Sequence, residues 1–462
     1  MVRDLTQGSV TRLLLRFAFP FMLSNLLQTV YNMVDMIVVG QYVGKVGLSA
    51  VGTGSEILHM MTFIGMGFSS AGQIMISQYV GRKDMASIKK TIGSMFTIIL
   101  SSAVILTVAC LVFAKPILNA LNVPAEAYSE AFDYSIVCYI GLFFIYGYNT
   151  VSAILRGMGD SRRPFVFIAI AAVMNLVLDL LFVAVFDMRS FGAALATVMG
   201  QGFSFIVSVV YLYRHRDAFG FDFKLKSFKV DVAIMKLMMR LGLPMMLQSC
   251  AINISMLFVT SYINGYGVTA SAVTGVGNKI SLIMNVVSNS MNMAGSSMIG
   301  QNLAAGKQER VPKIVRTSML VSCGFALLLS AIMLALPEQV FSLFNSEPEV
   351  LAMAHTYAPV AVINFFGFAT RAPFFSLING IGFASFGLFV GLMDGVVMRI
   401  GLILVFDKVF ALGLFGVWLG HALAGYTCSF IGGGYYLSGR WKRRKLIIGD
   451  AAAAEAPAEV EE

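Results

Sequence analysis

Long apolar stretches recur along the whole chain of 462 residues, separated by short segments rich in charged residues. Twelve of these stretches are close to or above the ~20 residues that an α-helix needs to cross a lipid bilayer. The pattern therefore predicts an all-α polytopic membrane protein with twelve transmembrane helices. The predicted spans are 16–41, 54–79, 92–114, 131–154, 164–187, 192–213, 238–263, 276–301, 316–336, 354–378, 383–406 and 412–437.

The second half of the chain repeats motifs of the first half at an offset of about 220–224 residues. The matching segments are FPFMLSNLLQ at 19–28 with LPMMLQSCAI at 243–252, SQYVGRKD at 77–84 with GQNLAAGKQ at 300–308, and VAVFD at 183–187 with ILVFD at 403–407. Each repeat contains six predicted helices, and an even number of crossings returns the chain to its starting side. We therefore expect two six-helix lobes with the same orientation, related by a pseudo-two-fold axis along the membrane normal.

The repeats divide the chain into four predicted segments. An N-terminal lobe covers 1–215, a cytoplasmic linker covers 216–237, a C-terminal lobe covers 238–445, and a disordered acidic tail covers 446–462. The end of the tail, DAAAAEAPAEVEE, is acidic and low in complexity, so we expect it to be disordered.

Composition and charge support a membrane protein. Hydrophobic residues make up 58% of the chain and charged residues 12%, which is about half the charged share of an ordinary soluble domain. With the N-terminus placed in the cytoplasm, 26 of the 33 Lys and Arg residues lie in segments on that side. This positive-inside distribution predicts cytoplasmic termini in a prokaryotic plasma membrane, and it explains the net charge of +9 without a nucleic-acid partner.

Ionisable and polar residues lie at matching depths in three predicted helices of the first lobe. Asp35 and Asp179 lie about seven and eight residues before the outer ends of their helices, and Thr197 about six residues into the next helix. All three are roughly 10 Å below the outer boundary at 1.5 Å per residue. Asn175 shares a helix face with Asp179. Because a carboxylate at the centre of a spanning helix costs roughly 3 kcal/mol, these residues form a candidate functional site.

Two carboxyl groups in such a site favour a bound cation. Either one group keeps a proton or a metal ion neutralises the pair. Asn and Thr oxygens suit Na⁺, and they equally satisfy a carboxylic acid, so the residues leave H⁺ and Na⁺ open as the ion at Asp35, Asn175, Asp179 and Thr197. A polar network that holds the helices together without titrating is the structural alternative.

A second group of side chains is predicted to line a substrate cavity. Its members are amides on one face of each of two predicted helices, a cation, and a flexible, polarizable methionine, which suits apolar ligands of many shapes. The predicted lining residues are Gln28, Asn32, Met256, Asn285, Asn289, Asn292 and Arg371. Asp394 and Arg399 are five residues apart and are predicted to form a structural pair.

Motifs of common enzyme classes are missing from the sequence. It contains neither the phosphate-binding pattern GxxxxGK[ST] nor HExxH, and its four histidines are dispersed. We therefore predict no cofactor and no enzymatic activity. A secondary transporter driven by an ion gradient fits the duplicated lobes and the buried carboxyl groups.

The chain resembles the multidrug and toxic compound extrusion (MATE) transporters. The resemblance extends to about residue 445 and includes PFMLSNLLQTVYNMVDMIVVG at 20–40, LRGMGDSRRP at 155–164 and NLVLD at 175–179. It is most similar to the DinF-like branch, in which an N-lobe cation site has residues that match Asp35, Asn175, Asp179 and Thr197. Acidic residues that NorM-like members carry in the seventh and tenth helices are absent here, with Arg371 the only charge in the tenth.

The resemblance implies a multidrug efflux transporter that works by alternating access of two lobes. Its expected partners are small-molecule drugs, organic cations and other amphipathic toxic compounds, exported against H⁺ or Na⁺, and the lipid bilayer; the protein is expected to be a monomer. A lipid-linked oligosaccharide flippase of the same superfamily is the alternative. Such a flippase is expected to line its cavity with several cations for pyrophosphate, whereas the first lobe here is acidic.

Overall fold

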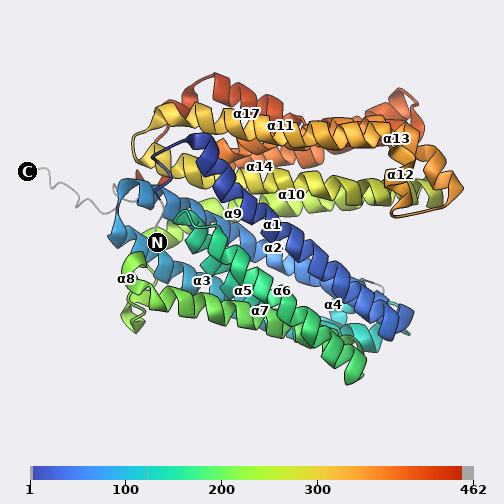
Figure 1. Cartoon of the computed structure of the whole chain (residues 1–462), viewed down its shortest axis with the longest axis horizontal. Helices are drawn as coiled ribbons and strands as arrows, with labels where there is room; N and C mark the ends of the chain where they lie inside the picture. The colour runs from blue at the N-terminus through green and yellow to red at the C-terminus, as the bar shows by residue number, and fades with distance from the viewer. Residues whose placement is uncertain (1–3, 122, 450–462) are drawn as a thin grey trace, which may run out of the picture. The chain divides into compact units, whose positions relative to one another are not determined.

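The computed structural model describes residues 4–121 and 123–449, and these residues form helices joined by short turns and loops, without a strand (Figure 1). The long helices of the first half are α1 (Val10–Tyr42), α2 (Gly44–Arg82), α3 (Met85–Val112), α5 (Tyr128–Gly157), α6 (Arg162–Asp179) with its π-helical continuation η1 (Leu180–Val185), and α7 (Arg189–Arg214).

The second half has the same order of long helices. They are α9 (Val232–Asn264), α10 (Val268–Ala304), α11 (Val311–Ala335), α13 (Pro348–Gly380), the joined segments α14 (Ala384–Leu392), η4 (Met393–Met398), α15 (Arg399–Leu404) and η5 (Val405–Val409), and then α16 (Gly413–Ala424) with α17 (Thr427–Leu437). Shorter helices are α4 (Ala114–Ala120), α8 (Arg216–Phe219), η2 (Leu225–Phe228), η3 (Gln308–Arg310), α12 (Pro337–Ser342) and η6 (Arg440–Arg443).

The described helices confirm a polytopic membrane protein. Ten of them are long and apolar enough to cross a bilayer, and α2 and α10, of 39 and 37 residues, complete the twelve predicted spans. Large apolar side chains such as Ile105, Val173, Leu257 and Leu327 are exposed on the helices. A lipid environment removes these side chains from water, which explains why so many of them lie outside the packed interior.

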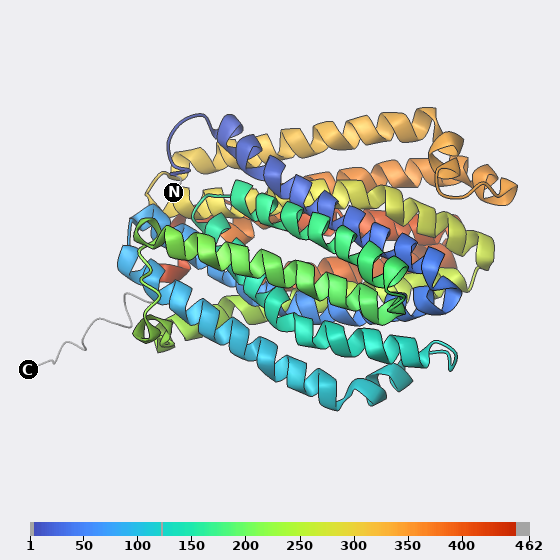
Figure 2. The same cartoon turned by 60° about the horizontal axis from the view of Figure 1, so that its bottom comes forward.

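The chain divides into two compact units. Among the described residues, the first unit contains residue 4 and residues 19–246, and the second contains residues 5–18 and 247–449. Within the first unit α5 packs against α2 and α7, and within the second α13 packs against α10 and α11. Both views show the helices inside each unit lying side by side (Figures 1 and 2). The predicted lobe boundaries at 1–215, 216–237 and 238–445 stay a prediction.

The two halves share an unusual local backbone at positions 224 residues apart. The π-helix η1 follows α6 in the first half, and η5 follows α15 in the second. Beyond them Asp187 and Ala411 have φ angles of 51° and 53°. These backbone features pair Asp187 with Ala411, so the sequence match of Asp187 with Asp407 is wrong by four residues. The duplication itself is confirmed in the backbone.

The offset between the halves changes by one residue at η4. Before η4 the offset is 223, as two glycines show. A Cβ added at Gly157 would lie 2.8 Å from the carbonyl oxygen of Gln73, and a Cβ added at Gly380 would lie 2.9 Å from the carbonyl oxygen of Ser296. The two glycines therefore occupy equivalent positions in the two halves. A π-helix accommodates one additional residue. The described α6 has no π-helix at the equivalent place. Therefore η4, which contains Asp394, is an insertion specific to the second half.

Three predicted spans differ in detail from the observed helices. The spans 164–187 and 383–406 contain π-helices, and the span 412–437 breaks between α16 and α17. At the end of the described chain Ile447 and Ile448 are buried, so order extends past residue 446, where the sequence predicts a disordered tail. The remainder of the predicted tail, 450–462, lies outside the described residues.

The segment after α7 packs against α3 within the first unit. Lys89 Nζ on α3 donates to Asp222 Oδ2 at 2.9 Å. Hydrogen bonds from Ser227 and Lys89 lower the pKa of Asp222 below its usual range, because both stabilise the carboxylate form. Phe96 on α3 stacks on Phe221 at 6.4 Å between ring centroids. Part of the predicted linker is thus anchored on the first unit by polar and aromatic contacts.

Gly93 allows this close approach, and we expect Gly93→Ala to destabilise the protein. A Cβ at Gly93 would overlap the backbone carbonyl oxygen of Ser227. Because backbone cannot rotate away as a side chain does, the expected loss is about 1–3 kcal/mol in the free energy of unfolding, measured by denaturant titration in detergent. Gly52 on α2 is the control, since nothing lies within 4 Å of its added Cβ. A loss no greater than that of Gly52→Ala would show that the contact is not tight.

Candidate functional site

A buried polar cluster joins three helices of the first unit. Thr197 Oγ1 on α7 donates to Asp35 Oδ2 on α1 at 3.3 Å. Asn175 Nδ2 on α6 donates to Thr197 Oγ1 at 3.5 Å. Asp35 is 8% exposed and Asn175 is 3% exposed. The structure therefore brings together residues whose depths match in the sequence.

Asp179 completes the cluster. It is the last residue of α6, immediately before η1, and it is fully buried. Its carboxyl group is adjacent to that of Asp35, close enough for a hydrogen bond once one of the two carries a proton. All four residues predicted for cation binding are thus neighbours within one unit.

Four oxygen atoms of the cluster have no hydrogen-bond partner among the described residues. Asp35 Oδ1, Asn175 Oδ1 and both carboxyl oxygens of Asp179 are buried without a hydrogen-bond partner. Each of these atoms is an acceptor unless a carboxyl group is protonated. Buried acceptors without partners are energetically costly, so the site favours a species that supplies positive charge.

Local backbone features position these side chains. A Cβ at Gly200 would lie 3.1 Å from the carbonyl oxygen of Ala171 and 3.3 Å from Asn175 Cβ. The missing side chain lets α7 approach α6, so that Thr197, one turn earlier, reaches Asn175. The π-helix η1 begins directly after Asp179, and such π-turns frequently occur at functional sites.

The donor set fits H⁺ or Na⁺. A proton on Asp35 or Asp179 would convert one acceptor oxygen into a donor and leave one negative charge. A sodium ion would be held by carboxyl oxygens with the amide and hydroxyl oxygens of Asn175 and Thr197, which are ligands that a hard cation prefers. The described residues contain no group of three or more His, Cys, Asp or Glu side chains placed for a metal.

Two further residues beside the site were not predicted from the sequence. Gln201 Nε2 on α7 donates to Tyr31 Oη on α1 at 3.4 Å. Tyr31 precedes Asp35 by four residues and Gln201 follows Thr197 by four, so each shares a helix face with a site residue. Examining the positions four residues before and after each predicted site residue would have found both Tyr31 and Gln201.

The predicted substrate-cavity residues of the second unit line two different cavities. In the second unit a cavity of about 320 Å³ is lined by Asn285, Ser288, Asn289, Asn292, Phe368, Arg371, Ala372 and Phe375. Met256 instead lines a separate cavity of about 400 Å³ that also contains Asn278 and His421. Gln28 and Asn32 lie on α1 in the first unit.

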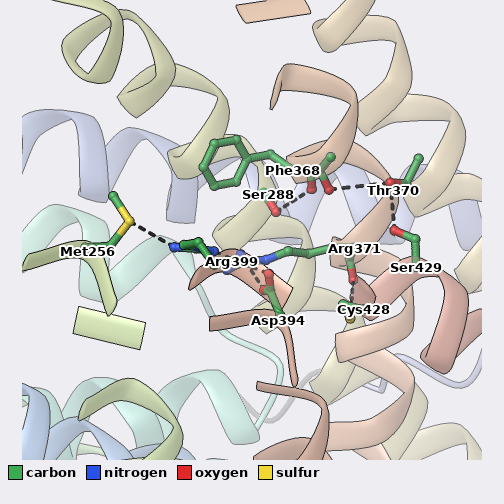
Figure 3. Close-up of polar contacts among 10 residues, drawn as sticks. Met256, Ser288, Phe368, Thr370, Arg371, Asp394, Arg399, Cys428 and Ser429 are labelled. Atoms are coloured by element: carbon green, nitrogen blue, oxygen red, sulfur yellow. Dashed lines mark hydrogen bonds and ion pairs between the residues drawn. The ribbon is translucent and has the colours of Figure 1, made fainter. Parts of the chain in front are cut away.

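The predicted pair of Asp394 and Arg399 is confirmed. Arg399 Nη2 donates to Asp394 Oδ1 at 3.3 Å, and Arg399 Nη1 contacts Met256 Sδ at 2.9 Å (Figure 3). Arg371 Nη1 lies 3.7 Å from the other carboxyl oxygen of Asp394. Two arginines therefore share one fully buried carboxylate.

Duplicated helical units, apolar outer surfaces and an ionisable cluster inside one bundle define a polytopic membrane transporter. The chain belongs to the MatE family, whose sequence profile matches residues 20–181 and again residues 244–405. The two matches lie 224 residues apart and confirm the internal repeat. Because this is a family of transporters, the prediction of a transporter rather than an enzyme is confirmed.

Relatives and solved structures agree with this membership. The chain is 29% identical over 450 residues to the probable multidrug resistance protein YpnP of Bacillus subtilis, covering 96% of this chain and 98% of that protein. It is 22% identical to the probable multidrug resistance protein NorM of Thermotoga maritima, covering 94% of each. A crystal structure of MATE in the bent conformation matches with a TM-score of 0.85 at 24% identity, covering 97% of this chain and 98% of that one. Similarity to the DinF-like branch stays a prediction.

Proposed function

We propose that the protein exports organic cations and other amphipathic toxic compounds by antiport against H⁺ or Na⁺. The coupling ion binds at Asp35, Asn175, Asp179 and Thr197, while alternating access of the two lobes carries the cargo across. The observation that carries this proposal is the cluster of buried acceptor oxygens without partners on three of these side chains. Multidrug resistance in the names of several relatives supports the class of cargo.

In antiport the ion and the cargo cross the membrane in opposite directions. With both carboxyl groups bare, the site holds two negative charges in a low-dielectric setting, which is unfavourable. A cation from outside relieves this repulsion, and its movement down its electrochemical gradient to the inside supplies the driving force for the outward movement of cargo. The positive-inside distribution of Lys and Arg supports cytoplasmic termini, and an ion gradient directed inward would drive the cargo outward.

The test uses purified protein in proteoliposomes with a fluorescent cationic dye. We expect dye transport when a pH gradient or a Na⁺ gradient is imposed separately, and no transport in protein-free liposomes. A fluorescent lipid-linked oligosaccharide, added in a parallel assay, tests the flippase. Movement of that lipid without dye transport under either gradient would contradict antiport of drugs.

Thr197→Val should weaken ion coupling without removing it. The valine is close in size but cannot donate to Asp35, so the carboxylate loses its hydrogen bond at 3.3 Å. A hydrogen bond to a charged group contributes about 1.5–3 kcal/mol, so the ion concentration for half-maximal transport should change about tenfold or more. Thr197→Ser keeps the hydroxyl and is the matched control. Equal ion dependence in both variants would remove Thr197 from the site.

A further inference from the structure

The second half carries a copy of the cation site in which the charges are inverted. Pro20 and Pro244 align α1 with α9 at an offset of 224, and η1 with η5 gives the same offset for the helices that follow. The corresponding residues are Asp35 and Val259, Asn175 and Arg399, Asp179 and Ile403, and Thr197 and His421.

The geometry of the second unit supports this correspondence. In the first unit α7, which carries Thr197, packs against α6, which carries Asn175, and in the second unit α16, which carries His421, packs against α15, which carries Arg399. Val259 and His421 both line the cavity of about 400 Å³. Both carboxyl groups of the first site are replaced by apolar residues and a neutral amide by a guanidinium. This part of the second unit therefore lacks the pair of carboxyl groups that the first site has.

Arg399 changes the charge balance around Arg371. Asp394 is the only described carboxylate that pairs with either arginine, and its contact with Arg399 is the shorter one, 3.3 Å against 3.7 Å for Arg371. Arg399 is 5% exposed, so it depends on this partner to be charged in the interior. With Asp394 neutralised by Arg399, one positive charge remains, and it is located at Arg371.

Arg371 presents this surplus charge to a cavity. Its guanidinium carbon lies 5.5 Å from the ring centroid of Phe368 and 5.7 Å from that of Phe375. All three residues line the cavity of about 320 Å³. Figure 3 shows Arg371 and Phe368. Among the described residues, the guanidinium of Arg371 has an ion pair with Asp394 but no side-chain hydrogen bond to its N–H donors. The amides of Asn285 and Asn289, one helical turn apart on α10, line the same cavity.

We propose that this cavity in the second unit binds an aromatic carboxylate, with Arg371 as the charged contact. The planar guanidinium can bind a carboxylate through two parallel hydrogen bonds, and the asparagine amides supply further donors. Phe368 and Phe375 offer apolar faces for an aromatic body. One surplus positive charge matches a monoanion, whereas a phosphate monoester, with two charges, would leave a buried negative charge.

This inference does not rest on the proposed export of organic cations. A cation in the same cavity would be repelled by Arg371, so an organic cation and an aromatic carboxylate must bind to different side chains. The ligand of the second unit is thus an anion, opposite in charge to the coupling ion of the first unit.

The test is equilibrium binding of benzoate to the purified full-length protein in detergent, measured by calorimetry. We expect benzoate to bind, the neutral isostere benzamide to bind at least tenfold more weakly, and phenyl phosphate to bind more weakly than benzoate. Arg371→Gln should reduce benzoate affinity at least tenfold and should remain folded, because Asp394 and Arg399 then form a neutral pair. Equal binding of benzoate and benzamide, or unchanged binding in Arg371→Gln, would overturn the proposal.

Two control variants test whether benzoate binding is specific to this cavity. Lys279→Gln removes another cation of the second unit, one that lies over the Phe344 ring and outside the cavity. It should leave benzoate affinity unchanged; a loss equal to that of Arg371→Gln would indicate a general charge effect and refute the site. Asp35→Asn should bind benzoate like the wild type, so loss of cation transport in that variant does not affect this test.

Discussion

Asp35→Asn reduces gradient-driven dye transport to the level of protein-free liposomes while the protein remains folded. The asparagine can still accept the hydrogen bond from Thr197, so packing around α1 and α7 is retained. It has no charge and cannot take up or release a proton. With only Asp179 left, the site no longer needs a cation to relieve repulsion between two carboxylates, and the driving ion loses its binding energy.

The measurement is dye uptake into proteoliposomes at equal protein content, with folding checked by size-exclusion chromatography and thermal unfolding. Asp179→Asn should behave in the same way, because the two carboxyl groups act together. The control is Asp187→Asn, which changes an exposed carboxylate at a φ of 51° that asparagine tolerates. Wild-type transport by Asp35→Asn would remove Asp35 from the coupling mechanism.

Asp394→Asn has a different expected effect, a large loss of stability. Asp394 is fully buried between Arg399 and Arg371, and it supplies the only described negative charge that pairs with them. The amide would leave two neighbouring guanidinium groups without a counter-charge. Breaking a buried pair by removing one partner costs about 3–5 kcal/mol, so the free energy of unfolding should decrease by this amount.

Denaturant unfolding in detergent measures this loss, again with Asp187→Asn as the exposed control. The double variant Asp394→Asn with Arg371→Gln removes one of the two orphaned charges and should recover part of the stability. If Asp394→Asn instead folds with wild-type stability and loses dye transport, then the second unit takes part in ion coupling, contrary to the mechanism proposed above.

The helices, the duplication and the grouping of the candidate site could be predicted because each depends on regular geometry. Hydropathy over ~20 residues locates a membrane span, and the fixed rise of a helix converts sequence position into depth. That conversion put Asp35, Asp179 and Thr197 at one level, where the structure places them as neighbours. Their role as a coupling site stays a prediction, since geometry alone does not test transport.

Other features could not be predicted because they depend on exceptions to that geometry. Each of the π-helices η1, η4 and η5 shifts the register of its helix by a residue, and the residue propensities of LLFVAV and MDGVVM do not predict them. The sequence groups Met256 with the asparagines of α10, whereas in the structure its sulfur contacts Arg399 and its side chain lines a separate cavity. Such assignments require the packing of helices that are distant in the sequence.

Infrared difference spectroscopy of the purified protein tests the central claim most directly, because it observes the carboxyl groups without requiring a known cargo. Spectra are recorded on a step in pH and on addition of Na⁺, for the wild type, Asp35→Asn and Asp179→Asn. At least one of the two ions should change carboxyl bands of the wild type, and that change should be absent from both variants. Identical ion-induced changes in all three proteins would contradict binding of the coupling ion by Asp35 and Asp179.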